Sequence, residues 1–181
     1  MKKINKKDIL PNFQKLMKAP GYSKKSTIQG VILQEIKNIP GERGTFQELM
    51  RFNKKGESAL FKNFQILQIN RSLVLPGAIK AWHLHLQQED IWYVPPESYF
   101  LVGLLDLRKK SPTSNLQMRF VMGADQSQFL LIPRGVAHGM ANLSTFEGEI
   151  IYFVNQHFNP DDELRLPWDL LGKEFWQIHF E

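Results

Sequence analysis

Short hydrophobic runs separated by turn-forming residues dominate the chain from Ile28 onward. The runs are rich in Val, Ile, Leu, Phe, Trp and Tyr, and Gly, Pro, Asn and Ser stand between them, which is the pattern of strands joined by turns. We expect strands at 30–35, 64–72, 79–85, 91–94, 100–106, 117–122, 129–132 and 149–155. Because no helical period lies between them, the pattern disfavours a βαβ fold and predicts an antiparallel barrel or jelly roll.

The first 25 residues have a different pattern, polar and basic. One short apolar spacing, Phe13, Leu16 and Met17, fits a brief helix that Pro20 and Gly21 are expected to end. No internal repeat or domain boundary is visible. We therefore expect a single domain over residues 1–181, with residues 1–25 as a basic N-terminal arm.

The formal net charge is +5, and much of the excess lies in this arm. The lysines of the arm are Lys2, Lys3, Lys6, Lys7, Lys15, Lys18, Lys24 and Lys25. A charge run confined to one terminus is typical of a solvated segment, so we expect no nucleic-acid partner. There is no cysteine, which excludes disulfides, thiolate metal sites and a cysteine nucleophile.

The location of the protein is predicted to be cytoplasmic. Charged and polar residues follow the basic N-terminus, where a signal peptide has an apolar segment. No stretch approaches the roughly 18 apolar residues of a membrane span, so we expect no membrane partner.

Three histidines are the first candidates for chemistry. His83 and His85 are two residues apart on an expected strand, so their side chains point to the same face. His138 follows the turn residues Pro133 and Gly135. Two strands of a barrel would aim the three imidazoles at one interior.

These segments resemble the paired motifs of the cupin superfamily, G-x5-H-x-H-x3-E and P-x-G-x2-H-x3-N. The matching residues are Gly77, His83, His85, Glu89, Pro133, Gly135, His138 and Asn142, while Pro96 and Ser127 stand where the pattern has glycines. The resemblance implies an all-β cupin fold, a double-stranded β-helix or jelly-roll barrel, here with short N- and C-terminal helical segments.

A narrower resemblance covers residues 40 to 172. The segments Gly41–Glu48, Gln68–Ser72, Gly77–His83, Asp106–Arg108, Ser111–Thr113, Ile132–Gly139, Asn142–Ser144, Tyr152 and Asn159–Glu163 are similar, in order, to motifs of the dTDP-4-dehydrorhamnose 3,5-epimerase family. That family inverts carbons beside the ketone of a 4-keto sugar nucleotide. The chain resembles a divergent member, which implies a nucleotide-sugar substrate and no cofactor.

The resemblance also implies roles for individual residues. His83 matches the base, because an imidazole titrates near neutrality, and Tyr152 matches the acid, because a phenol stays protonated. The positions that match substrate-binding residues are Arg43, Phe46, Glu48, Gln68, Asn70, Lys80 and His138. The family pairs its barrels, so a homodimer is expected, with Phe46 reaching toward the neighbouring site.

Two departures change the expected chemistry. Asp90 stands in the place of the family's lysine, which stabilises the enolate. The base of the family is oriented by an aspartate beyond the tryptophan that matches Trp176, and this chain ends at Glu181. We expect Asp90 or Asp125 to substitute as the carboxylate that orients His83.

Two other functions stay open. A metal-dependent cupin enzyme would use His83, His85, Glu89 and His138 to bind a divalent transition metal. A non-catalytic sugar-nucleotide binding protein would keep the pocket without the reaction. Metal content separates the first from the epimerase, and entry of solvent deuterium into the sugar separates the second.

Overall fold

The computed structural model describes residues 3–17 and 26–178 and consists mainly of antiparallel strands. The strands are β1 (Ile32–Glu35), β2 (Ile39–Gly41), β3 (Gly44–Phe46), β4 (Gln68–Val74), β5 (Ile79–Leu84), β6 (Asp90–Val94), β7 (Tyr99–Asp106), β8 (Gln117–Gly123), β9 (Gln128–Ile132), β10 (Val136–Asn142), β11 (Gly148–Val154) and β12 (Leu164–Arg165). The helical turns are η1 (Lys6–Asp8), α1 (Pro11–Gln14), η2 (Pro160–Asp162) and η3 (Lys173–Trp176).

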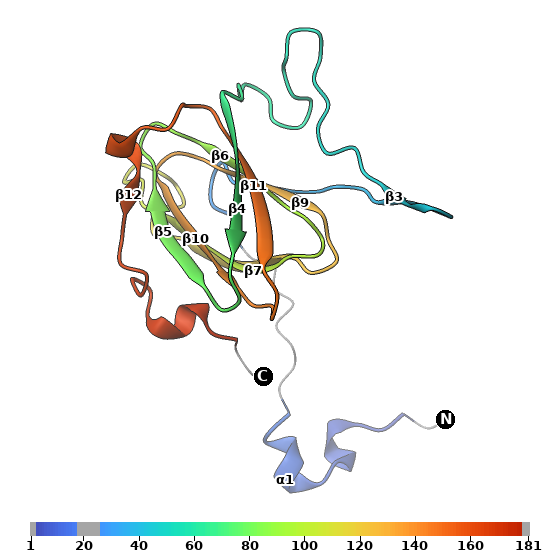
Figure 1. Cartoon of the computed structure of the whole chain (residues 1–181). Coiled ribbons are helices and arrows are strands. Elements are labelled where there is room, and N and C mark those ends of the chain that lie inside the picture. The colour runs from blue at the N-terminus through green and yellow to red at the C-terminus, as the bar shows by residue number, and fades with distance from the viewer. Residues whose placement is uncertain (1–2, 18–25, 179–181) are drawn as a thin grey trace.

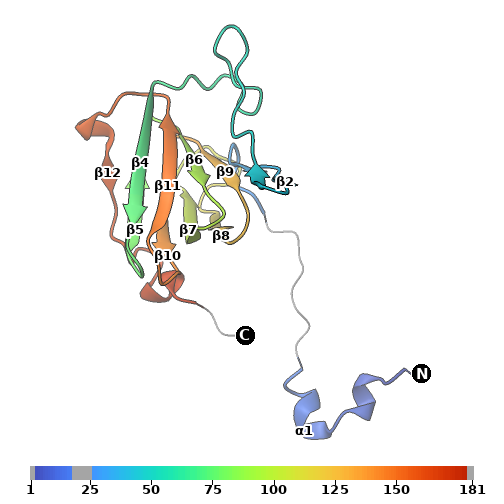
Figure 2. The same cartoon turned by 45° about the vertical axis from the view of Figure 1, so that its right-hand side comes forward.

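Two five-stranded sheets face each other and form the jelly roll (Figure 1). One sheet has the order β1-β9-β6-β11-β4 and the other β12-β5-β10-β7-β8. The strands β2 and β3 form a separate hairpin that projects from the barrel (Figure 2). The predicted all-β jelly roll with short terminal helical segments is confirmed.

The main core fills the space between the two sheets. Phe100, Val102 and Leu104 of β7 face Leu130 of β9 and Ile150 of β11 there, and all five are buried. Such alternation along each strand is what places one face on a core. The barrel is therefore packed at one part of its interior and leaves room for a cavity at another.

The outer face of each sheet is partly covered as well. Phe175 and Trp176 of η3 pack on Trp82 in the second sheet. Phe61 and Phe64, from the segment between β3 and β4, belong to the cluster on the first sheet. These covers explain why several strands are buried on both faces.

The eight expected strands are all present with somewhat different ends, and the short strands β2, β3 and β12 were not predicted. Residues 64–67 precede β4 and are not a strand. Strand β10 was missing from the prediction, because its sequence, VAHGMAN, has small residues in place of the β-branched and aromatic ones that mark strands. It lies between β5 and β7 and is buried throughout.

The N-terminal segment contains η1 and α1 and is drawn apart from the barrel (Figure 1). The brief helix expected around Phe13 begins at Pro11 and ends at Gln14. Its predicted end at Pro20 and Gly21 lies outside the described residues. Within the part of the chain that the structure describes, no helix has the length and apolar character needed to cross a membrane.

Candidate active site

A cavity opens between the two sheets. Strands β4, β6 and β11 supply one wall, and β5, β10 and β12 supply the other. The residues that line it are Ser72, Lys80, His83, His85, Gln88, Asp90, Trp92, His138, Met140, Ile150, Tyr152, Glu163 and Arg165. Its volume of about 190 Å³ is below the roughly 300 Å³ typical of sites that enclose a drug-sized ligand. It has room for the reacting part of a larger substrate, whose remainder would lie outside.

The three candidate histidines meet in this cavity. His138 of β10 lies directly opposite His83 of β5 in the ladder. The two rings stack with centroids 5.9 Å apart and an interplanar angle of 14°, and the His85 ring lies 5.5 Å from the His138 ring. The edge of Trp92 closes the cluster at 5.3 Å from His138.

A close approach of β5 and β10 makes this arrangement possible. The register shifts between His138 and Met140, as in a β-bulge. A Cβ atom added at Gly139 would lie 2.4 Å from the Cβ of Ala81, so only glycine fits there. Gly139, one of the small residues that concealed β10 in the sequence, is therefore needed for this close approach of the two strands.

Glu163 orients the His83 ring. Its Oε1 lies 3.0 Å from Nδ1 of His83, and Nε2 of the same ring lies 3.0 Å from a guanidinium nitrogen of Arg165. Because a guanidinium only donates, Nε2 accepts and Nδ1–H donates to Glu163. The short strand β12 pairs with β5 and places Arg165 opposite His83.

The prediction that Asp90 or Asp125 orients His83 is therefore corrected. Asp90 lies against His138, with 3.7 Å between its Oδ2 and Nε2 of His138. Asp125 lies in the turn between β8 and β9, in the left-handed region with φ 67°. Glu163 ends the motif Asn159–Glu163, and that motif was the only sequence signal pointing to it.

The surroundings shift the pKa values of the groups in the cavity. Burial, followed by the neighbouring His138 and Arg165, lowers the pKa of His83 to about 4 against the opposing effect of Glu163. Burial also lowers the pKa of His138, although Asp90 acts in the other direction. Burial, Asp90 and Glu163 raise the pKa of Tyr152. At neutral pH His83 and His138 are thus neutral imidazoles beside the protonated phenol of Tyr152.

Asp162 fixes His85 and the loop that follows it, a role that the sequence did not reveal. The backbone N–H groups of Leu86, Gln87 and Gln88 donate to its carboxylate at 2.8 to 3.2 Å. Its backbone carbonyl accepts from Nδ1 of His85 at 2.7 Å. The η2 turn thereby positions His85 through Asp162, and Glu163, which follows it, positions His83.

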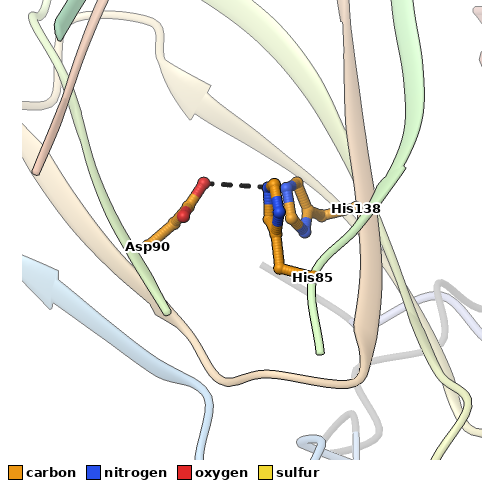
Figure 3. Close-up of side chains that lie close together, drawn as sticks. All are labelled: His85, Asp90 and His138. Atoms are coloured by element: carbon orange, nitrogen blue, oxygen red, sulfur yellow. Dashed lines mark ion pairs between the residues drawn. The ribbon is translucent and has the colours of Figure 1, made fainter. Parts of the chain in front are cut away.

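Glu89 lies apart from the three histidines. Its Oε2 accepts from Nδ2 of Asn155 at 3.0 Å and lies 3.4 Å from Arg134. The carboxylate that joins the histidines is Asp90 instead. Among the described residues, the group that could hold a metal ion consists of His85, Asp90 and His138 (Figure 3).

The predicted substrate-binding residues on β4 and β5 lie beside the cavity. Gln68 and Asn70 share one face of β4 with Ser72 and are joined by a hydrogen bond of 2.8 Å. Nζ of Lys80 donates to the Ser72 hydroxyl at 2.7 Å, at an exposed edge of the cavity. Of these residues, Ser72 and Lys80 line the cavity, whereas Gln68 and Asn70 lie further along β4.

Arg43, Phe46 and Glu48 lie away from the cavity of their own chain. Arg43 and Phe46 belong to the projecting β2–β3 hairpin, and Phe46 is 63% exposed (Figures 1 and 2). Glu48 forms an ion pair with Arg51. Within one chain, the structure therefore separates these three from the other predicted site residues.

Related proteins are similar in sequence to this chain over most of its length. "Spore coat polysaccharide biosynthesis protein SpsL" of Bacillus subtilis is 40% identical over 144 residues, which cover 78% of this chain and 91% of that protein. The dTDP-4-dehydrorhamnose 3,5-epimerase of Shigella flexneri is 31% identical over 148 residues, or 80% of each chain.

Solved structures agree with these relatives. A dTDP-4-dehydrorhamnose 3,5-epimerase from Bacillus anthracis, with TDP and PPi bound, matches with a TM-score of 0.72 and 25% identity over 86% of this chain and 90% of that one. A dTDP sugar isomerase from Desulfovibrio desulfuricans matches with a TM-score of 0.70 and 27% identity over 84% and 91%.

A family model adds the most direct assignment. The model for dTDP-4-dehydrorhamnose 3,5-epimerase matches residues 25–172, which include every cavity residue and the projecting hairpin. The predicted resemblance is confirmed, and this chain belongs to the dTDP-4-dehydrorhamnose 3,5-epimerase family.

Proposed function

We propose that the chain epimerises the sugar of a dTDP-linked 4-keto-6-deoxyhexose, with His83 as the base and Tyr152 as the acid. One observation carries this proposal: the two residues line the same cavity from facing sheets, His83 on β5 and Tyr152 on β11. Inversion of a carbon requires a proton to leave one face and another to arrive at the opposite face. A base and an acid on opposite walls meet that requirement.

The steps follow from the hydrogen bonds of the two groups. Nδ1–H of His83 is donated to Glu163, so Nε2 carries the lone pair that takes the proton beside the ketone. The electron pair of the broken C–H bond moves to the carbonyl oxygen and forms an enolate. Tyr152 then donates its proton to the opposite face, and the ketone forms again.

Arg165 has to leave Nε2 of His83 before the base can act. Its side chain is 60% exposed and comes from the two-residue strand β12, so it has space to turn outward. Lys80 stands at the exposed edge of the cavity, where an ammonium group suits one phosphate of a diphosphate. Gln68 and Asn70 follow Ser72 on the same face of β4 and are proposed to contact the part of the substrate outside the cavity.

The proposed assembly is a homodimer that completes the nucleotide site. Arg43, Phe46 and Glu48 match nucleotide-binding positions of the family but lie on or beside a hairpin that projects from the barrel. An aromatic residue with 63% exposure on such a hairpin favours contact with a second copy. We propose that this hairpin reaches the neighbouring cavity, and that the protein acts in the cytoplasm on a soluble nucleotide sugar.

The experiment is incubation of dTDP-4-keto-6-deoxyglucose with the protein in deuterated water, followed by ¹H NMR of the C3 and C5 positions. We expect deuterium at one or both carbons and the appearance of an epimer. The matching UDP sugar serves as a control for nucleotide selectivity. Saturable binding of the dTDP sugar without deuterium entry would contradict the proposed reaction and leave a binding protein.

A further inference from the structure

Three buried side chains from different strands converge in the cavity wall. His85 directly follows β5, Asp90 begins β6, and His138 lies in β10. Their exposed fractions are 6%, 4% and 3%. The potential ligand atoms of the three all lie within 4.8 Å of one another, and the Asp90 carboxylate faces the two rings (Figure 3).

The hydrogen bonds of the two rings fix which nitrogen carries the proton. Nδ1 of His85 lies 2.7 Å from the carbonyl oxygen of Asp162, and Nδ1 of His138 lies 3.0 Å from that of Val136. A carbonyl oxygen only accepts, so each Nδ1 is protonated and each Nε2 has a lone pair. A histidine that binds a metal commonly donates its other ring N–H to a carbonyl in this way.

Asp90 brings a negative charge to the same point. Its Oδ2 lies 3.7 Å from Nε2 of His138, which is its only ion-pair contact within the described residues. Two neutral donors also bond the carboxylate, Gln88 Nε2 at 2.7 Å and Trp92 Nε1 at 3.3 Å. The same Gln88 nitrogen also lies 3.4 Å from Nε2 of His85, so this amide has to turn away for an ion to bind. Two lone pairs and a buried carboxylate then converge, an arrangement that a bound cation stabilises.

We propose that His85, Asp90 and His138 bind one divalent transition-metal ion. Two histidines and one carboxylate form a site with open positions, and they suit zinc, iron(II), manganese or cobalt. Ligand atoms about 2.1 Å from a tetrahedral ion are about 3.4 Å apart, so the observed 3.7 Å between Asp90 and His138 needs only a small adjustment.

The proposed ion has a place in the reaction, although this part rests on the proposed epimerase function. The three ligands line the same cavity as His83 and Tyr152. An enolate needs positive charge beside its oxygen. The ion would supply that charge, while His83 remains outside the ligand set because Glu163 and Arg165 occupy its two ring nitrogens.

The test uses the full chain without a histidine tag, stripped with EDTA and then titrated with Zn²⁺ and with Co²⁺. We expect about one ion per chain, visible absorption bands for the Co²⁺ form, and a higher unfolding temperature with metal. Asp90→Asn is expected to weaken binding at least about 100-fold, since even changes around the ligands cost 10- to 100-fold. Glu89→Gln changes the adjacent carboxylate, which lies outside the cluster, and is expected to leave binding unchanged.

Each other outcome has a defined meaning. Far less than one ion per chain, or binding that Asp90→Asn does not alter, would overturn the proposed site. If Asp90→Asn does not fold, His85→Gln tests the same ligand set. Metal binding without deuterium entry into the sugar would support the metal site and reject the epimerase. Deuterium entry at an unchanged rate in the metal-free protein would support the epimerase and reject a role for the ion in the reaction.

Discussion

Two buried aspartates of the barrel, Asp90 and Asp106, have opposite surroundings. Asp106 is fully buried, and Arg108, Ser111 and Thr113 bond its carboxylate at 2.6 to 2.8 Å. Asp90 has two neutral donors and faces imidazole lone pairs across a cavity. Asp106 belongs to a segment that resembles the family and is a satisfied structural charge, whereas Asp90 stands in the place of the family's lysine and faces the cavity.

The difference shows how a conserved fold can hold two kinds of buried charge. The Asp106 cluster joins the segment after β7 to Gln29 through Arg108 and Thr113, and none of these residues lines the cavity. Breaking such a satisfied pair costs stability. At Asp90 the carboxylate has neutral donors alone and lines the cavity, where a ligand would use it, so changes there are expected to affect chemistry more than folding.

The largest effect on the exchange rate is expected at the cavity, from His83→Gln. Loss of a general base typically costs 100- to 10,000-fold, so we expect deuterium entry into the dTDP sugar to fall about 1,000-fold. The free energy of unfolding should stay within about 1 kcal/mol, because the side chain lies at the cavity and is not part of the packed core. NMR exchange and urea unfolding measure the two quantities, and exchange at the wild-type rate would remove His83 from its role.

A smaller effect is expected from the residue that orients this base. Glu163→Ala removes the partner of Nδ1 and is expected to slow exchange about 100-fold, by loss of ring orientation. Glu163→Gln keeps an acceptor oxygen and loses only the charge, so about tenfold is expected. Equal rates for the two variants and the wild type would show that Glu163 does not orient His83.

A change in the Asp106 cluster is expected to affect stability alone. Thr113→Val removes the hydroxyl that donates to Asp106 at 2.7 Å and accepts from the backbone of Gln29 at 2.9 Å. The loss of a hydrogen bond to a charged group is expected to lower the free energy of unfolding by about 2 kcal/mol. The deuterium exchange rate of the folded variant serves as the control and should not change.

The pH dependence of stability tests whether the ionised carboxylate of Asp106 stabilises the fold. The Arg108 guanidinium, with Ser111 and Thr113, holds the pKa of Asp106 well below its ordinary value of 3.8. A depressed pKa in the folded state stabilises the protein above the ordinary value, and this contribution is lost as the pH falls below it. The stability difference between wild type and Asp106→Asn should therefore shrink below pH 3.8 in acid titrations, and a constant difference would contradict the assignment.

The sequence predicted the strands with alternating apolar residues and the meeting of the three histidines, because side-chain period and motif spacing are local properties. Strand β10 was missed because a glycine is required at position 139 by contact with Ala81, which is distant in sequence. Glu163 was missed for a similar reason: it reaches His83 only because β12 pairs with β5. Contacts between distant segments decide both, and no single-segment pattern contains them.

The central claim is that Asp90 serves chemistry and Asp106 serves folding, and a comparison of Asp90→Asn with Asp106→Asn tests it most directly. For each metal-stripped variant, urea unfolding at pH 7 gives stability, and deuterium entry after metal is restored gives activity. We expect Asp90→Asn to keep or gain stability and lose exchange, and Asp106→Asn to lose about 3 kcal/mol and keep exchange. Loss of stability with normal exchange at Asp90, or the reverse at Asp106, would contradict the account.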